Sequence, residues 1–175
     1  GVADVGIVGE NEYVEKGSKA QLVKRLGFSK CRLSVAIPKD EKYEGSKWFN
    51  GKTIATSYPV ILDAYLKEQN VQANIHVITG SVEIAPGIGL ADAIFDIVSS
   101  GSTLVSNQLK EVEVVMRSEA LLISAPQLSP DKQAILEELL FRIEAIQLAD
   151  GKKYVLLNAP KERLNDIIEV LPGMK

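Results

Sequence analysis

Apolar and polar positions along the chain follow two periods, and their order predicts an α/β protein. Residues 5–8 form a short apolar run closed by Gly9, which favours a buried parallel strand. Residues 21–28 and 31–38 alternate with a period of two, and the turn between them predicts that they pair as neighbouring strands. The charged, turn-rich segment 39–50 is the expected crossing between two lobes.

A second series of strands and helices begins after this segment. Strands are expected at residues 52–57, 74–80 and 89–98, and Pro59 suits the first turn of a helix between the first two of them. Residues 111–126 are rich in β-branched side chains and too long for a hairpin arm. We therefore expect this segment to carry the chain back to the first lobe.

The strongest helical pattern spans residues 129–150. Ser129 is the expected N-cap and Pro130 suits the first turn. The apolar stripe of this helix consists of Ile135, Leu139, Ile143 and Ile146. Residues 153–160 then predict a strand and residues 161–173 a last helix. This alternation of strands and helices indicates an α/β fold with a largely parallel sheet in each lobe.

Composition and charge exclude several classes of protein. The chain has 46% hydrophobic and 25% charged residues, which is ordinary for a globular domain. A net charge of -3 argues against a general nucleic-acid or membrane-surface binder, because those need clustered cations. Cys31 is the only cysteine, so the sequence predicts neither a disulfide framework nor a cysteine-based metal site, as expected for a cytoplasmic protein. No apolar run approaches the length of a membrane span.

The most informative stretch for function is DIVSSGSTLVSN, residues 96–107, because it places many small polar side chains at the end of a predicted strand. In α/β sheets, ligands bind beyond the carboxyl ends of strands, where loops lead into helices. A glycine lets the backbone curl around a small anion, to which free N–H groups and hydroxyl groups donate hydrogen bonds. The turn consists of Ser99, Ser100, Gly101, Ser102 and Thr103. An ordinary serine-rich turn that caps a short helix remains the alternative.

Two acidic residues near this turn narrow the class of ligand. Asp96 shares a strand face with Ile94 and Val98, and Glu83 lies thirteen residues earlier. Two carboxylates repel a phosphate, but they accept hydrogen bonds from sugar hydroxyls. The combination therefore predicts a sugar phosphate as the ligand.

These segments together resemble one enzyme family. The run GSVEIAPGIGLADAIFDIVSSGSTLVSNQLKEVEVV, residues 80–115, closely resembles the phosphoribosyl-diphosphate-binding segment of ATP phosphoribosyltransferase, the first enzyme of histidine biosynthesis. GVADVGIVGEN, CRLSVAIP, GKTIATSYP, RSEALLI and APKERLNDIIEVLPG resemble other segments of that family, in the family's order. The resemblance covers essentially the whole chain, and the combination is far more specific than SSGST alone.

The resemblance implies a reaction and a set of site residues. The family transfers the phosphoribosyl group of phosphoribosyl diphosphate to N1 of ATP and releases pyrophosphate, with Mg²⁺ on the substrate diphosphate. By this resemblance, Ser99 to Thr103 hold the 5-phosphate, while Asp96 and Glu83 hold ribose hydroxyls. The residues implied on the nucleotide side are Glu10, Arg32, Ser57 and Tyr58. The chemistry needs no covalent enzyme group, and no metal site built from protein ligands alone is expected.

Three of the nucleotide-side residues have simpler interpretations that the sequence leaves open. Arg32 suits a phosphate because a guanidinium binds two oxygens at once, but it also suits a surface salt bridge. Tyr58 precedes a proline and is equally consistent with packing. Glu10 either lines the cleft or caps the helix that follows.

The resemblance also implies a fold and a division into lobes. The family's catalytic part is a two-lobed fold of the type II periplasmic-binding-protein kind, and we expect mostly parallel sheets with helices on both faces. Residues 1–37 and 115–175 are assigned to lobe one and residues 38–114 to lobe two, which binds phosphoribosyl diphosphate. We expect lobe one to lack about sixty preceding residues, a length that the resemblance implies, and the C-terminal histidine-binding regulatory domain to be absent.

The implied partners are ATP and phosphoribosyl diphosphate, with no nucleic acid and no membrane. The spacing resembles the long form of the family, which forms homo-oligomers, hexamers of dimers. If nucleotide contacts lie upstream, the chain binds phosphoribosyl diphosphate without turning it over. The alternative function is a non-catalytic small-molecule-binding or effector-sensing module of the same two-lobed fold.

Overall fold

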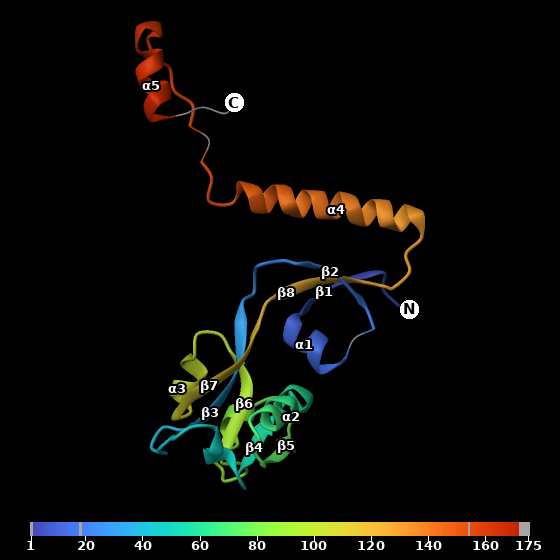
Figure 1. Ribbon diagram of the computed structural model, residues 1–175, viewed down its shortest axis with the longest axis vertical. Helices are drawn as coiled ribbons and strands as arrows, with labels where there is room; N and C mark the ends of the chain where they lie inside the picture. Colours follow the sequence, from blue (N-terminus) through green and yellow to red (C-terminus); the bar gives the residue numbers. More distant parts are fainter. Residues whose placement is uncertain (1, 18, 154, 172–175) are drawn as a thin grey trace. The chain divides into compact units, whose positions relative to one another are not determined.

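The structure is a computed structural model that describes residues 2–17, 19–153 and 155–171. Its contacts divide the chain into two units, Gly1–Leu128 and Ser129–Lys175, and each is described by itself. The first unit contains both sheets, and the described part of the second consists of helices and connecting segments (Figure 1).

The first unit is built on a five-stranded and a three-stranded sheet. The larger has the order β5-β4-β6-β3-β7 and the smaller the order β1-β8-β2. The strands are β1 (Val5–Gly9), β2 (Gln21–Arg25), β3 (Cys31–Pro38), β4 (Thr53–Thr56), β5 (Asn74–Val77), β6 (Ala93–Val98), β7 (Leu109–Ser118) and β8 (Ala120–Ser124).

The α/β fold is as predicted, but the expectation of mostly parallel sheets is wrong. β4 pairs parallel with β5 and β6, whereas β3 pairs antiparallel with β6 and β7. β8 pairs antiparallel with both β1 and β2. One reason is that the segment β7–β8 runs back beside β2 and β3: β7 pairs antiparallel with β3, and β8 pairs antiparallel with β2 (Figure 1). Both β3 and β7 lie in the five-stranded sheet, and the division into lobes at residues 37 and 115 remains a prediction.

Helices cover both faces of the five-stranded sheet. On one face α2 (Pro59–Glu68) and the 3₁₀ turn η1 (Ser46–Phe49) pack on the core. This core includes Leu33, Val35, Phe49, Leu62 and Phe95. On the other face η2 (Val82–Ile84) and α3 (Ser102–Ser106) pack on Ala36, Ile94 and Val98. Alternation along β3 and β6 thus sends successive side chains to opposite layers.

Two sequence interpretations of the first unit were wrong, and a third stays open. Residues 21–28 and 31–38 do not pair with each other, because β7 and β8 take those positions: β2 pairs with β8 and β3 with β6 and β7. Segment 39–50 joins β3 to β4 within the five-stranded sheet, and Phe49 is fully buried in the core of that sheet; its crossing between lobes stays a prediction, as does the division into lobes. β1 is an antiparallel edge strand, and Ile7 is 58% exposed rather than buried.

The second unit contains α4 (Pro130–Ala149), the short turn η3 (Lys161–Arg163) and α5 (Leu164–Val170), which confirms the two helices predicted there. Ser129 occupies the N-cap, but its side chain makes no capping hydrogen bond. The predicted stripe is not a buried face: Ile146 is 72% exposed, and Leu136 is the buried residue of α4. No strand forms in residues 155–160, and Tyr154 of that prediction lies outside the described residues. Among the described residues, no helix has the length and apolar character that a membrane crossing requires.

Candidate functional site

The predicted phosphate loop lies where β6 ends and α3 begins. Gly101 takes the N-cap position of α3 with φ 84° and ψ 0°, in the left-handed region that glycine adopts without strain. The Ser100 and Ser102 hydroxyl oxygens are 3.0 Å apart, and both side chains are exposed. A Cβ on Gly101 would meet only Val98, at 3.9 Å, so the conformation rather than the space requires glycine. The loop therefore presents hydroxyl groups and backbone N–H groups to solvent at the carboxyl end of a central strand.

The two predicted carboxylates lie on elements that contact each other: Asp96 on β6, which leads into this loop, and Glu83 on η2. Asp96 is half-buried on β6, on the face that carries Ile94 and Val98, as the alternation predicts. Burial raises the pKa of Asp96, and the nearby Glu83 carboxylate raises it further, while the Ile97 N–H that Asp96 accepts at 2.8 Å lowers it. The proximity of Glu83 follows from η2, which packs against β6.

Arg32 is fully engaged by groups of its own chain. Its Nε and Nη2 donate to the two carboxylate oxygens of Glu111 at 2.5 and 2.7 Å, and its Nη1 donates to the Ser99 carbonyl at 2.9 Å. The Ser34 hydroxyl donates to the same carboxylate at 2.6 Å. The bond from Arg32 is the main reason that the pKa of Glu111 is lowered. Sequence reasoning predicted Arg32 but missed Glu111 and Ser34.

The other predicted nucleotide residues are spread over the junction of the two sheets. Glu10, the first residue of α1 (Glu10–Glu15), forms an ion pair with Arg25, which also binds Glu119 at 3.2 Å. Ser57 donates to the Ile78 carbonyl at 2.8 Å. Arg32 and Asp96 thus lie next to the Ser99–Thr103 loop, whereas Glu10 and Ser57 are held by partners of their own elsewhere at the junction.

Tyr58 belongs to a buried polar network at this junction. The Asn11 side-chain amide donates to the Tyr58 hydroxyl at 3.1 Å, and the Ser118 hydroxyl donates to the Asn11 side-chain oxygen at 2.8 Å. Burial, followed by the Glu12 carboxylate, raises the pKa of Tyr58 to about 12, so its hydroxyl stays protonated at neutral pH. The network joins α1, α2 and β7.

A second contact joins α1 to α2. The Glu15 carboxylate accepts the N–H groups of Val60 and Ile61, at 2.9 and 3.0 Å. These are among the first N–H groups of α2, which have no partner inside the helix. A carboxylate there also interacts favourably with the positive end of the helix dipole. The α2 end of the junction is thus fixed by a residue from α1.

Comparison with known families shows the family to which the chain belongs. The family model described as ATP phosphoribosyltransferase, HisG, matches residues 1–145. The chain belongs to the ATP phosphoribosyltransferase family. A curated ATP phosphoribosyltransferase of Parabacteroides distasonis is 77% identical over all 175 residues, and one of Bacteroides fragilis is 71% identical over the same length. The chain spans 62% of the length of each of these relatives.

Solved structures support the same fold. The ATP phosphoribosyltransferase HisG:HisZ complex of Thermotoga maritima matches with a TM-score of 0.73 and 27% identity, over 86% of this chain and 73% of that chain. An alkanesulfonate-binding protein, SsuA of Xanthomonas axonopodis, matches with a TM-score of 0.56 and 12% identity, over 84% of this chain and 56% of that chain. The second match shows the fold alone, and it confirms the expected periplasmic-binding-protein-like type II architecture.

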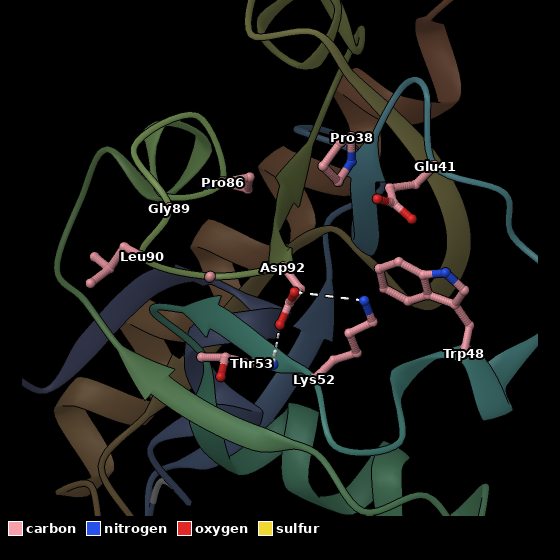
Figure 2. A pocket seen from close by; sticks show the side chains of 10 residues that line it. Pro38, Glu41, Trp48, Lys52, Thr53, Pro86, Gly89, Leu90 and Asp92 are labelled. Carbon is pink, nitrogen blue, oxygen red and sulfur yellow. Dashed lines mark hydrogen bonds and ion pairs between the residues drawn. The ribbon is translucent and has the colours of Figure 1, made fainter.

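Figure 2 shows a separate cavity of about 340 Å³ that the sequence did not predict. Lys52 Nζ lies 3.7 Å from an Asp92 oxygen and 4.6 Å from the centroid of the Trp48 ring. Asp92 also accepts the Thr53 N–H at 2.9 Å. The cavity lies at the amino ends of β4 and β6, away from the Ser99–Thr103 loop, and two of its charged side chains, Lys52 and Asp92, pair with each other. In an α/β sheet this is the end opposite to the usual ligand site.

Replacing Tyr58 by phenylalanine is expected to lower the free energy of unfolding by about 1–3 kcal/mol, because the buried amide of Asn11 loses its acceptor. Urea denaturation followed by circular dichroism measures this loss. Tyr65→Phe is the matched control, since burial also raises the pKa of Tyr65 to about 12 and no hydroxyl partner occurs among the described residues. Equal losses in both variants would contradict the role of the network.

Proposed function

We propose that this chain belongs to an enzyme that transfers the phosphoribosyl group of phosphoribosyl diphosphate to N1 of ATP, with release of pyrophosphate, as the first step of histidine biosynthesis. One observation carries the proposal: in a chain of this family, an exposed Ser99–Thr103 loop lies at the carboxyl end of β6 beside two carboxylates. This arrangement suits a sugar phosphate better than a plain anion.

Different residues of the chain are proposed to bind the phosphate and the ribose of the substrate. The hydroxyl and N–H groups of Ser99 to Thr103 donate hydrogen bonds to the 5-phosphate. Asp96 and Glu83 accept the ribose hydroxyls and lie where positive charge develops on the sugar ring during transfer. The rest of the catalysis is positioning of adenine N1 and the anomeric carbon, which needs no covalent group on the enzyme.

Mg²⁺ is proposed to arrive with the substrate. The described residues contain no group of three or more acidic, histidine or cysteine side chains that would hold a metal ion. The two neighbouring carboxylates Asp96 and Glu83 fit a cation that is bound mainly by substrate oxygens and water, which is the usual habit of Mg²⁺. When bound, the cation supplies charge neutralisation to the leaving diphosphate.

The nucleotide side is proposed to lie across the junction of the two sheets. Tyr58 and Ser57 follow the carboxyl end of β4, next to the end of β6, and Glu10 begins α1 on the other side. Tyr58 is buried and its hydroxyl is held by Asn11, so its proposed role is to fix the start of α2 against α1 on this side of the site. We also propose that the enzyme is cytoplasmic and forms a homo-oligomer, a hexamer of dimers as in the long form of the family. Its lobe one is proposed to consist of residues 1–37 and 115–175, and its lobe two of residues 38–114.

Calorimetric titration of this chain with phosphoribosyl diphosphate and Mg²⁺ tests the proposal first. We expect saturable binding, followed by an ATP-dependent release of pyrophosphate in a protein extended to the length of its relatives. Binding without any pyrophosphate release in the extended protein would replace the enzyme by a binding module of the same fold. Absence of binding to the folded extended protein would overturn the proposed substrate.

A further inference from the structure

Arg32 on β3 and Glu111 on β7 meet Ser99, the residue that follows β6, because β3 lies next to both β6 and β7. β3 lies between β6 and β7 in the five-stranded sheet. Arg32 is in register with Val98, the last residue of β6, so Ser99 follows directly beside it. Its side chain therefore reaches the backbone of the phosphate loop at the point where the loop leaves the sheet.

The contacts hold the guanidinium in one orientation. Two of its nitrogens donate to both oxygens of Glu111, and the third donates to the Ser99 carbonyl at 2.9 Å. The Ser34 hydroxyl donates to the same carboxylate from the next position on that face of β3. A bidentate pair of this kind fixes direction as well as distance. The side chains of Arg32 and Glu111 are 27% and 25% exposed, so the pair is partly shielded from solvent.

Holding the Ser99 carbonyl also directs the next backbone donor. In a trans peptide the C=O and the following N–H point in opposite directions, and the described residues contain no cis peptide bond. With the Ser99 oxygen on Arg32, the Ser100 N–H points away from Arg32. The next peptides lead into Gly101 and the start of α3, where the Ser102 N–H donates to the Ser100 hydroxyl at 3.4 Å.

We propose that Arg32 is a positioning residue that orients the phosphate loop through the Ser99 carbonyl, and that Glu111 and Ser34 hold Arg32 for this task. The inference rests on the proposed function for its ligand, phosphoribosyl diphosphate. This positioning role takes the place of the predicted direct contact between Arg32 and the nucleotide. A guanidinium that is already paired with a carboxylate offers little net charge to a phosphate.

Two variants distinguish positioning of the phosphate loop by Arg32 from direct binding of the nucleotide by Arg32. We expect Arg32→Lys and Glu111→Gln each to raise the Kd for phosphoribosyl diphosphate about tenfold, which corresponds to about 1.4 kcal/mol. The double variant is expected to bind no more weakly than the worse single variant, because both changes break one unit. The Kd for ATP stays unchanged in all three. If Arg32 binds the nucleotide directly, Arg32→Lys weakens ATP binding and Glu111→Gln does not, and that result overturns the proposal.

Two further measurements distinguish loss of positioning by Arg32 from a general loss of stability and from failure of the proposed ligand. Arg142→Lys and Glu138→Gln alter another arginine–glutamate pair, on α4, and are expected to change neither Kd. Without ligand, the backbone ¹⁵N chemical shift of Ser100 is expected to change in both the Arg32 and Glu111 variants at an unchanged thermal unfolding midpoint, because the peptide group that joins Ser99 to Ser100 loses its hydrogen bond from Arg32. If the parent chain binds no phosphoribosyl diphosphate, the proposed ligand fails while this shift still tests the orientation. An unchanged Ser100 shift in both variants overturns the positioning role.

Discussion

Replacing Gly101 by valine is expected to raise the Kd for phosphoribosyl diphosphate by about 100-fold or more, a loss of about 2.7 kcal/mol. Gly101 has φ 84°, and a β-branched residue is a rare outlier in that region. A side chain there costs about 1–2 kcal/mol, which the loop avoids by leaving its observed conformation. The N–H groups at the start of α3 then no longer converge on one anion. Isothermal titration calorimetry with Mg²⁺ present measures the loss.

Gly51→Val is the matched control for this variant. Gly51 has φ 72° and open space around its Cβ position, so it carries similar backbone strain. It lies before the amino end of β4, whereas the phosphate loop follows the carboxyl end of β6, which runs parallel to β4. We expect the control to lower the free energy of unfolding by a similar amount and to leave the Kd unchanged. Equal weakening of binding by both variants would show that strain alone, and not the loop, accounts for the effect.

Replacing Asp96 by asparagine is expected to act in opposite directions on binding and on stability. An amide replaces a carboxylate that accepts ribose hydroxyls, so the Kd for phosphoribosyl diphosphate rises about 10- to 100-fold. The free energy of unfolding rises at neutral pH, because burial disfavours the ionised carboxylate in the native protein. Calorimetry and urea denaturation measure the two effects on the same samples.

The pH dependence of this effect has a definite sign. The native pKa of Asp96 lies above its ordinary value of 3.8, so the native protein binds this proton more tightly than the unfolded chain does. Its contribution to stability is largest below 3.8 and is lost as the pH rises through the native pKa. The stability curves of parent and Asp96→Asn should therefore separate as the pH rises from 3.8 towards neutrality. Asp63→Asn, an exposed aspartate on α2, is the control, and a gap that narrows with rising pH would refute the argument.

Local features of the sequence predicted the local structure around the candidate site, whose role stays a prediction. Strand alternation placed Asp96 on one face with Ile94 and Val98, and the Ser/Gly pattern marked the turn into α3. Both depend on residues near in sequence, where period and turn chemistry decide the outcome. The partner of Arg32 was missed because Glu111 lies 79 residues further along the chain and reaches it only through strand order.

The same limit explains the errors in the fold. Residues 21–28 and 31–38 carry the alternation of a hairpin, yet the long segment β7–β8 pairs with both of them. Alternation fixes which side chains face the core but not which strand becomes the neighbour. Segment 39–50 looks like solvated loop because it is charged, but Tyr43, Trp48 and Phe49 form an aromatic cluster inside it. Their burial depends on tertiary packing that no short window of sequence contains.

The carboxylate of Glu15 has a consequence for how the first unit melts. It belongs to α1, which packs on β1 of the three-stranded sheet, and it accepts two backbone N–H groups of α2, which covers the five-stranded sheet. Unfolding of α1 alone would leave those two groups of α2 without their acceptor, and it would also remove Asn11 from Tyr58. Local opening on one side is therefore penalised on the other, so the two sheets lose their structure in a single cooperative transition.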